Sequence, residues 1–467
     1  MMTRIEHDLL GDRAVPETAY YGVHTLRAIE NFPITGTPIS IYPDLIIALA
    51  WIKEAAAKAN HDLGVLSLER SKAIVEACHL IRDGKYHREF VVDVIQGGAG
   101  TSTNMNANEV IANVALELLG KNKGDYATLH PNEHVNLSQS TNDVYPTAIK
   151  LALVTGIRRL QAAMSVLRQS FERKADEFDG IMKIGRTQLQ DAVPMTLGQE
   201  FSTYAVMLGE DEARLGEAAL LLQEINLGAT AIGTGINTHP SYAGLVRHHL
   251  SKITGRELIT ASNLVEATQD AGAFVQLSGV LKRVAVKLSK TCNDLRLLSS
   301  GPRGGFGEIN LPPVQAGSSI MPGKVNPVIP EMVNQVAFEV IGNDVTVSFA
   351  AEAGQLQLNA FEPIIAYSLF SSLNHMERAC LVLAEKCVNG ITANVDRLAE
   401  IVEQSLAIVT ALNPHIGYEN ATRVAMMAHG TGKTVRQTVL KLGLMAEGPL
   451  DAAIDVSTMV RPQALTG

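Results

Sequence analysis

The chain has 467 residues, of which 46% are hydrophobic and 19% charged, a balance that excludes a disordered chain and allows a large core. Its formal net charge of −9 excludes a basic surface of the kind that binds nucleic acid or an anionic membrane. Aromatic residues make up only 5%, and abundant Ala and Leu favour helices over a β-sandwich. The composition therefore predicts a soluble, all-α fold.

The beginning of the chain does not resemble a signal peptide. It contains Arg4, Glu6 and Asp8 where a signal peptide requires an apolar stretch. The apolar run 45–52 is too short to cross a bilayer. We therefore expect a cytoplasmic protein that does not enter a membrane.

Residues 1–141 are predicted to form an N-terminal, mainly helical domain in which short helices alternate with loops. Within it, residues 97–104 read Gly-Gly-Ala-Gly-Thr-Ser-Thr-Asn. Small and polar residues in such a row disfavour a regular core element and suit a loop that binds a ligand.

A central helical bundle is predicted over residues 142–396. Apolar residues recur at alternating spacings of four and three in the stretches 153–171, 201–225 and 277–298, and a further helical region covers about 330–395. Regular apolar stripes of this kind pack bundle helices against one another. The other helix faces stay free to pair with a second subunit, so we expect an oligomer. Shorter amphipathic pieces in residues 397–467 predict a small C-terminal helical domain.

Two segments next to predicted bundle helices are rich in hydroxyl and amide side chains. Residues 140–143 read Ser-Thr-Asn-Asp, and residues 185–191 read Gly-Arg-Thr-Gln-Leu-Gln-Asp. Such side chains at a helix start bind anions together with the backbone N–H groups and the helix dipole, so each segment is predicted to form half of a carboxylate clamp. The alternative for Ser140 or Thr141 is a purely structural role as a helix N-cap.

The most unusual stretch of the chain is the segment 311–327, in which four prolines and two glycines exclude regular structure. A loop of this length is usually functional. It contains Ser318 and Ser319, and the turn at Pro322-Gly323 allows Lys324 to fold back toward these hydroxyls, where a cation helps to ionise a serine and to hold a carboxylate. We expect this loop to act as a mobile lid.

Other patterns in the sequence do not predict a cofactor or a metal. The glycines of 228–235 lack the strand and helix context of a dinucleotide site, and 430–434 lacks the first glycine of a phosphate loop. The four cysteines lack a CxxC pair and are expected to be reduced core residues, and the thirteen histidines show no metal-binding spacing. His130 and His134 are interpreted as loop residues.

Four segments together resemble the fumarase/aspartase superfamily, and the resemblance covers nearly the whole chain in the order and spacing of that family. The serine loop alone is a specific marker of the superfamily. The segments are GGAGTSTNMNANEV at 97–110, QSTND at 139–143, GRTQLQDAVPMT at 185–196 and GSSIMPGKVNP at 317–327.

Details of these segments favour the aspartase branch over the fumarase branch. They are YYGVHTLR at 20–27, GGAGTS at 97–102, Thr141 after Ser140, and AVPMT at 192–196. The stretch His-Pro-Asn at 130–132 is closer to the fumarases. Gln188 replaces a histidine of fumarases but occurs among aspartases.

The resemblance implies a three-domain chain that forms a homotetramer around a shared helical bundle, with each active site built from three chains. It also implies a reversible anti-elimination of ammonia from L-aspartate to fumarate through an enediolate intermediate, without a cofactor. In this assignment Ser318 is the catalytic base. The substrate-binding residues are Thr101, Ser140, Thr141, Asn142, Thr187, Gln188, Ser319, Lys324 and Asn326.

The main alternative is fumarate hydratase activity on the same scaffold. An amine can depart as neutral ammonia, whereas hydroxide leaving malate requires a proton that Gln188 cannot give, so the residues favour ammonia. Family lyases that split argininosuccinate or adenylosuccinate handle bulkier substrates. A catalytically silent scaffold is the remaining alternative, and the intact Ser318, Lys324 and Asn326 speak against it.

Overall fold

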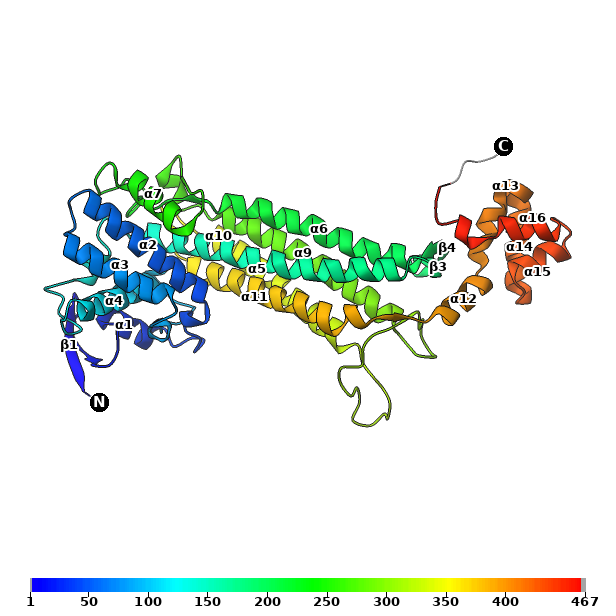
Figure 1. Ribbon diagram of the computed structural model, residues 1–467, viewed down its shortest axis with the longest axis horizontal. Coiled ribbons are helices and arrows are strands. Elements are labelled where there is room, and N and C mark those ends of the chain that lie inside the picture. Colours follow the sequence, from blue (N-terminus) through cyan, green and yellow to red (C-terminus); the bar gives the residue numbers. More distant parts are fainter. Residues whose placement is uncertain (1, 463–467) are drawn as a thin grey trace. The chain divides into compact units, whose positions relative to one another are not determined.

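The computed structural model describes residues 2–462, and these residues are mainly helical (Figure 1). They divide into two compact units. Unit 1 comprises residues up to 162 together with 213–285 and 336–377, and unit 2 comprises 163–212, 286–335 and the residues from 378 onward. Each passage of the chain from one unit to the other falls within a long helix.

Unit 1 contains a hairpin, a set of packed helices and a small parallel ladder. The helix α2 is rich in alanine and packs against α3 and α7. The elements are β1 (Thr3–Asp8), β2 (Gly11–Pro16), α1 (Val23–Asn31), α2 (Pro43–Asp62), α3 (Leu68–Arg82), α4 (Thr101–Leu118), β5 (Glu224–Ile225), α7 (Tyr242–Thr254), β6 (Ile259–Thr260) and α8 (Leu264–Ala267), with short helical turns at Ile39–Ile41, His87–Glu89 and Pro131–Val135.

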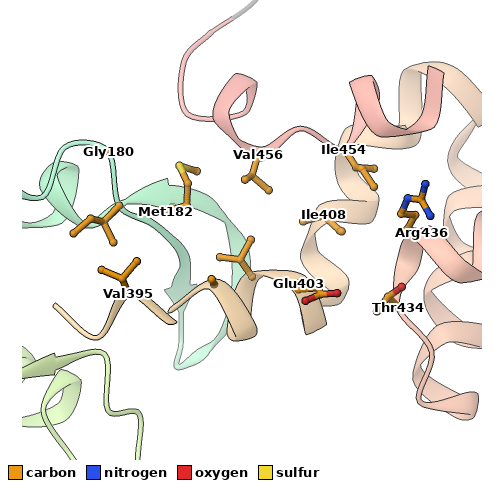
Figure 2. Close-up of a pocket in the computed structure, with 12 residues that line it drawn as sticks. Gly180, Met182, Val395, Glu403, Ile408, Thr434, Arg436, Ile454 and Val456 are labelled. Carbon is orange, nitrogen blue, oxygen red and sulfur yellow. The ribbon is translucent and has the colours of Figure 1, made fainter. Parts of the chain in front are cut away.

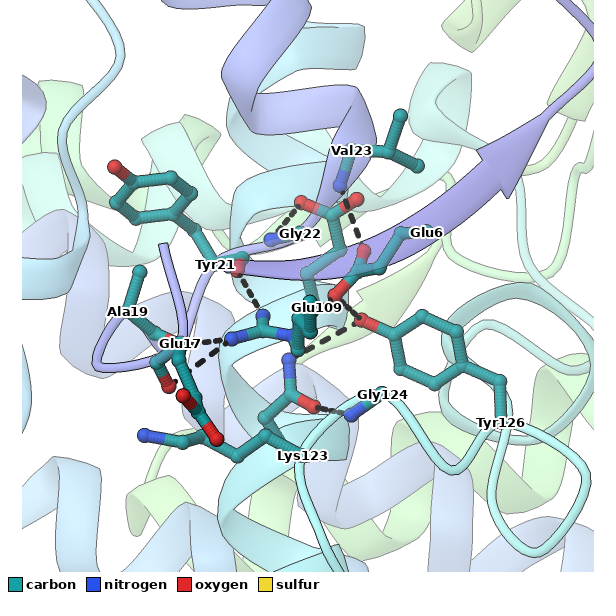
Figure 3. A network of polar contacts seen from close by, with 12 residues as sticks. Glu6, Glu17, Ala19, Tyr21, Gly22, Val23, Glu109, Lys123, Gly124 and Tyr126 are labelled. Carbon is teal, nitrogen blue, oxygen red and sulfur yellow. Dashed lines mark hydrogen bonds and ion pairs between the residues drawn. The ribbon is translucent and has the colours of Figure 1, made fainter. Parts of the chain in front are cut away.

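Buried carboxylates attach the N-terminal segment to α4 (Figure 3). Glu109 of α4 accepts backbone N–H groups from Gly22 and His24, each at 2.8 Å, and the Thr25 hydroxyl at 2.6 Å. Glu6 of β1 accepts the Val23 N–H at 2.8 Å. The Gly22 position has no room for a side chain, because a Cβ atom there would lie 2.5 Å from a Glu6 oxygen.

Five long helices form the bundle within residues 2–462, and they confirm the predicted helical stretches except that the second helix ends at Leu221 and the region 330–395 is divided between two helices. The apolar stripe predicted for the first of them is fully buried: Leu153, Ile157, Leu160, Met164, Leu167 and Phe171. The five helices are α5 (Thr141–Glu177), α6 (Leu197–Leu221), α9 (Gly272–Leu298), α10 (Val328–Glu352) and α11 (Glu362–Lys386).

Polar contacts between bundle helices are present inside each unit. In unit 1, the Ser278 hydroxyl of α9 donates to Asp344 of α10 at 2.8 Å. In unit 2, the Asn334 amide of α10 donates to the Ser289 hydroxyl of α9 at 2.8 Å. These bonds fix the register of neighbouring helices, because each joins buried polar side chains that need a hydrogen-bond partner.

Unit 2 also holds a second hairpin and the C-terminal helices. The C-terminal helices enclose their own apolar cluster, made by Ile408, Leu412, Val424, Val435, Val439 and Leu450. The elements are β3 (Met182–Thr187), β4 (Gln190–Thr196), β7 (Ile309–Asn310), β8 (Thr392–Ala393), α12 (Val395–Gln404), α13 (Asn413–Ile416), α14 (Tyr418–Thr431), α15 (Val435–Lys441) and α16 (Glu447–Ala453), with helical turns at Val388–Gly390, Leu406–Leu412 and Val456–Thr458.

The structure corrects the predicted environment of residues 185–191. This segment does not start a helix, because it forms the turn and the adjoining strand ends of the antiparallel hairpin of β3 and β4, and α6 begins only at Leu197. The helix-dipole argument therefore does not apply to Thr187 and Gln188. The division into domains 1–141, 142–396 and 397–467 stays a prediction.

Several other sequence expectations can be compared with the structure. The four cysteines are buried and free, as predicted. No helix in the described part of the chain is long and apolar enough to cross a membrane. Among residues 2–462 there is no group of three or more His, Cys, Asp or Glu side chains arranged to hold a metal ion.

Candidate active site

The glycine-rich segment before α4 brings Thr101 to the surface of unit 1. Gly98, Ala99 and Gly100 have φ angles of 87°, 55° and 88°, in the left-handed region that favours glycine. A side chain at Gly100 would collide with the ring of Tyr145 in α5. The glycines therefore allow a tight turn directly against α5. Thr101 begins α4 and is exposed, and its hydroxyl donates to the Gly98 carbonyl at 2.7 Å.

The Ser-Thr-Asn-Asp segment lies at the start of α5, as predicted. Helix α5 begins at Thr141, so Ser140 occupies the N-cap position. The Ser140 hydroxyl oxygen accepts the Asn142 N–H at 3.3 Å, and Asp143 returns a bond by accepting the Ser140 N–H at 3.0 Å. The predicted N-cap bond of Ser140 is therefore present. It leaves the hydroxyl hydrogen of Ser140 available for a ligand, because the cap uses only the oxygen.

The glycine-rich segment 228–235 supports the start of α5. Asp143 is fully buried and accepts the N–H groups of Gly228 at 3.1 Å and Thr230 at 2.9 Å. The Asn142 side-chain amide donates to the Ala231 carbonyl at 2.6 Å. Burial raises the pKa of Asp143 to about 6, against the effect of its backbone donors. The segment thus holds the predicted site residues in place.

Thr187 and Gln188 lie at the tip of the β3–β4 hairpin and are exposed. The two turn residues, Gln188 and Leu189, have φ angles of 54° and 63°. Two residues with positive φ are typical of the tight hairpin turn that usually contains glycine or asparagine. A side chain presented on such a tip extends away from its own sheet and is accessible to a ligand or a neighbouring chain.

A buried carboxylate anchors both this hairpin and the serine loop. Glu308 has no exposed side-chain surface and pairs with Lys183 of β3 at 2.8 Å and with Arg186 at 2.5 Å. The Arg186 guanidinium also lies over the Phe306 ring at 4.2 Å. Because Glu308 directly precedes β7, which leads into the serine loop, one carboxylate positions the beginnings of both segments.

In the serine loop, the side-chain oxygen of Ser318 is held by two backbone donors. The loop, residues 311–327, has no helix or strand, as predicted. The Ser318 Oγ atom accepts the backbone N–H groups of Ile320 at 3.2 Å and Met321 at 2.9 Å. Donors aimed at a hydroxyl oxygen stabilise its ionised form.

Hydrogen bonds join the two arms of the serine loop to each other. Gly317 N–H donates to the Lys324 carbonyl at 3.0 Å, and the Asn326 side-chain amide donates to the Gly317 carbonyl at 2.7 Å. A Cβ atom at Gly317 would collide with the backbone of Lys324, so glycine is required where the two arms meet. Ser319 and the Lys324 side chain are exposed.

The structure places the ten predicted residues in three groups. In unit 1, Ser140, Thr141 and Asn142 are consecutive at the start of α5, and Thr101 starts α4. Unit 2 contains the hairpin pair and the loop group of Ser318, Ser319, Lys324 and Asn326. Within the described part of unit 2, no hydrogen bond joins the hairpin pair to the loop group.

A cavity of about 470 Å³ in unit 2 is not part of this site (Figure 2). Apolar side chains dominate its lining, including Met182, Val395 and Ile454. Its one cation, Arg436, pairs with Glu447 at 2.5 Å and Asp451 at 2.6 Å. None of the ten predicted residues lines it.

Comparison with known proteins decides the family. A lyase family model matches residues 11–342, and a model of the fumarase C C-terminus matches residues 408–461. The chain belongs to the fumarase/aspartase superfamily. The predicted fold class is thereby confirmed.

Relatives in this superfamily match over nearly the full chain. The aspartate ammonia-lyase of Pseudomonas aeruginosa is 59% identical over 464 residues, which cover 99% of this chain and 98% of the relative. The aspartate ammonia-lyases of Helicobacter pylori and Escherichia coli are 56% and 55% identical, covering 99% and 98% of this chain and 98% and 96% of the relatives.

Solved structures agree with the fold. A fumarate lyase:delta crystallin from Brucella melitensis bound to cobalt is 56% identical, with a TM-score of 0.97, covering 99% of this chain and 100% of that chain. A recombinant class II fumarase from Schistosoma mansoni has a TM-score of 0.95 at 36% identity, with the same coverage.

Proposed function

We propose that this chain is an aspartate ammonia-lyase, which reversibly eliminates ammonia from L-aspartate to give fumarate. The observation that carries the proposal is the identity of 55–59% with aspartate ammonia-lyases over nearly the full chain, compared with 36% for the class II fumarase structure. The substrate class, a small dicarboxylate, also suits the hydroxyl, amide and lysine side chains of the three residue groups.

In this mechanism the side-chain carboxylate of aspartate accepts the charge that develops when the neighbouring carbon loses a proton. The resulting enediolate requires donors around its oxygens. We assign this role to Thr101, Ser140, Thr141 and Ser319. At Ser140 the hydroxyl oxygen is occupied by an N–H donor, which leaves the hydrogen for the substrate. At Thr101 the hydroxyl must turn away from the Gly98 carbonyl to bind the carboxylate.

We assign the role of base to Ser318. A serine hydroxyl is too weakly acidic to act as a base unless its ionised form is stabilised. The two backbone N–H groups on its oxygen provide part of this stabilisation. Closure of the loop over the substrate would exclude water and strengthen these bonds. Lys324, Asn326 and Thr187 hold the second carboxylate.

The departing group is ammonia rather than water. The protonated amino group, –NH₃⁺, leaves as neutral ammonia when the C–N bond breaks and its electrons go to nitrogen, so it needs no further acid. Asn142 and Gln188 suit an amine, because their amide oxygens accept hydrogen bonds. In Asn142 the NH₂ group already donates to Ala231, so its oxygen is the atom left for a ligand. Neither amide can supply the proton that departing hydroxide requires.

We also propose a homotetramer in which three chains contribute to each site. The bundle helices α6, α9 and α10 expose apolar side chains along their length, and a bundle shared between subunits would bury them. These side chains are Val206, Leu220, Val286, Phe338, Val345 and Phe349. The exposed Ile320 and Val325 in the serine loop, 83% and 51% accessible, fit an interface beside the site. The cytoplasmic location stays a prediction.

The test is to add L-aspartate and, separately, L-malate to purified protein while fumarate absorbance and free ammonia are recorded. Fumarate and ammonia in equal amounts from aspartate, with no fumarate from malate, is the expected result. Fumarate from malate alone would assign a hydratase, and no product from either substrate would assign a silent scaffold.

A further inference from the structure

A fully buried lysine lies beneath the predicted carboxylate-binding residues of unit 1. Lys53 of α2 has no exposed surface, and its ammonium donates to the side-chain oxygens of Asn104 at 2.8 Å, Asn136 at 2.9 Å and Gln139 at 2.9 Å. None of the ion pairs among the described residues involves it. A charge buried with only neutral partners is costly, which indicates a role other than fold stability.

The Lys53 ammonium determines which atom of each surrounding amide group, oxygen or nitrogen, faces it. A lysine ammonium has three donors and no acceptor, so each amide must present its oxygen to Lys53 and direct its NH₂ group elsewhere. Burial lowers the pKa of Lys53 to about 7, whereas the three oxygens around its nitrogen and the nearby Asp143 carboxylate favour the charged form.

The NH₂ group of Asn104 meets the start of α5. It donates to the Thr141 Oγ1 atom at 3.1 Å and to the Asn136 oxygen at 3.2 Å. The Thr141 oxygen is therefore an acceptor toward the protein. Its own hydrogen has no acceptor in the described part of the chain and is left to donate to a ligand.

We propose that Lys53 is a positioning residue that fixes the direction of a hydrogen-bond relay, Lys53 to Asn104 to Thr141, so that Thr141 presents its hydroxyl hydrogen to the substrate carboxylate. The inference rests on the proposed function, in which Thr141 stabilises the enediolate. Without the ammonium, the Asn104 amide can turn over and present its oxygen to Thr141, whose hydrogen then points into the protein and away from the substrate.

The neighbouring residues of the segment do not depend on this relay. Ser140 is oriented by Asp143, and Asn142 by the Ala231 carbonyl, both through bonds that do not include Lys53. Loss of Lys53 should therefore impair Thr141 more than its neighbours, because Lys53 reaches Ser140 only through its charge interaction with Asp143. This selectivity separates a positioning role from a general loss of structure.

The experiment measures kcat and KM for L-aspartate in Lys53→Met, Thr141→Val and the double variant. Methionine has a similar length but no donor. We expect kcat to fall about 30-fold in Lys53→Met and about 100-fold in Thr141→Val with KM changed less than about threefold, on the order of the loss of one preorganised donor. In the double variant we expect no further fall than in Thr141→Val alone, because residues that act in series are not additive.

Lys58→Met is the matched control on the same helix, since Lys58 is partly exposed and pairs with Glu54 at 2.5 Å. Its kcat should equal that of the wild type. A normal kcat in Lys53→Met, or a double variant in which the two losses multiply, would overturn the proposal.

Asn104→Asp tests the relay even where Lys53→Met does not fold. The carboxylate keeps the shape of the amide and gains an ion pair with Lys53, but it can only accept from Thr141. We expect a thermal midpoint at or above that of the wild type together with at least a tenfold lower kcat, and no further loss when Thr141→Val is added. Wild-type kcat in Asn104→Asp would contradict the relay. It would not affect the proposed function, which is tested separately by the fumarate and ammonia assay of the wild type.

Discussion

The two regions that carry the predicted site residues are held in different ways. At the start of α5, Thr141 and Ser140 are held by the buried side chains of Asn104 in α4 and of Asp143 in α5 itself. Asn142 donates to the backbone carbonyl of Ala231 in the segment 228–235. The serine loop is held by bonds within itself and by the Glu308 anchor before it, and most of its side chains are exposed.

The difference in how the two regions are held agrees with the two tasks proposed for them, stabilisation of the developing charge and removal of the proton. Donors that stabilise a developing charge act best when they do not have to reorganise, which requires a fixed support. A base that must exclude water from its substrate needs a segment that can close. The predictions below test this division of labour, from the largest expected effect to the smallest.

The largest effect is expected at Ser318. Ser318→Ala should lower kcat about a thousandfold or more, because it removes the group that takes the proton. Steady-state fumarate formation from saturating L-aspartate measures the loss. Ser319→Ala, which removes one carboxylate donor, is the control and should retain substantially more activity. A near-normal kcat in Ser318→Ala would exclude Ser318 as the base.

A smaller and different effect is expected at Lys324. Lys324→Ala should raise KM for L-aspartate at least about tenfold with a lesser change in kcat, because it removes a charged hydrogen bond to the carboxylate that does not change during the reaction. Lys433→Ala, in the segment that superficially resembles a phosphate loop, should leave both constants unchanged. An unchanged KM in Lys324→Ala would place substrate binding elsewhere.

The anchor of the loop region can be broken at Glu308. Glu308→Gln should lower the free energy of unfolding by about 3 kcal/mol, because Lys183 and Arg186 would lose their shared buried partner. Chemical denaturation measures the change. Glu217→Gln, which breaks an exposed pair with Arg214, should change stability by less than about 1 kcal/mol. Equal effects of the two substitutions would show that Glu308 is not an anchor.

The stability of unit 1, which contains the starts of α4 and α5, should depend on pH through Glu109. Glu109 lies in α4, the helix that begins with Thr101. Burial raises the pKa of Glu109 from 4.5 to about 7. Its stabilising contribution is therefore complete below pH 4.5 and is lost as the pH rises toward 7. The free energy of unfolding should fall by on the order of 2 kcal/mol over this window. Denaturation curves at pH 5 and pH 7.5 measure it.

The same curves for two variants make the assignment to Glu109 specific. Glu109→Gln should lack this part of the pH dependence, because the group no longer titrates. Glu117→Gln, on the same helix and bonded to the exposed Tyr20 hydroxyl, should retain it. An unaltered pH dependence in Glu109→Gln would assign the effect to another group.

The parts of the fold that follow from local pattern were predictable from the sequence. The buried seam of α5 follows from its alternating spacing, and the serine loop follows from its four prolines. The β3–β4 hairpin was not predicted, because its turn uses Gln188 and Leu189 in a conformation that normally requires glycine. The hairpin therefore carries no local turn signal.

Site residues could be predicted from the sequence where they lie within a recognisable motif. A residue that acts through other residues, outside any motif, could not be predicted in this way. Ser318 and Thr141 lie within recognisable segments. Lys53 lies in an apolar, alanine-rich helix, and its partners Asn104 and Gln139 come from other parts of the chain, so only folding brings them together. A lysine in the middle of a buried helix face is the one signal that could have identified it.

The most direct test of the division of labour is calorimetric titration of succinate, a dicarboxylate that cannot lose an amine, into the wild type and Ser318→Ala. If the fixed residues and Lys324 bind the substrate while Ser318 only moves the proton, the two dissociation constants will agree within about twofold despite the loss of turnover. A Ser318→Ala protein that no longer binds succinate would contradict this account, because Ser318 would then be a binding residue rather than the base.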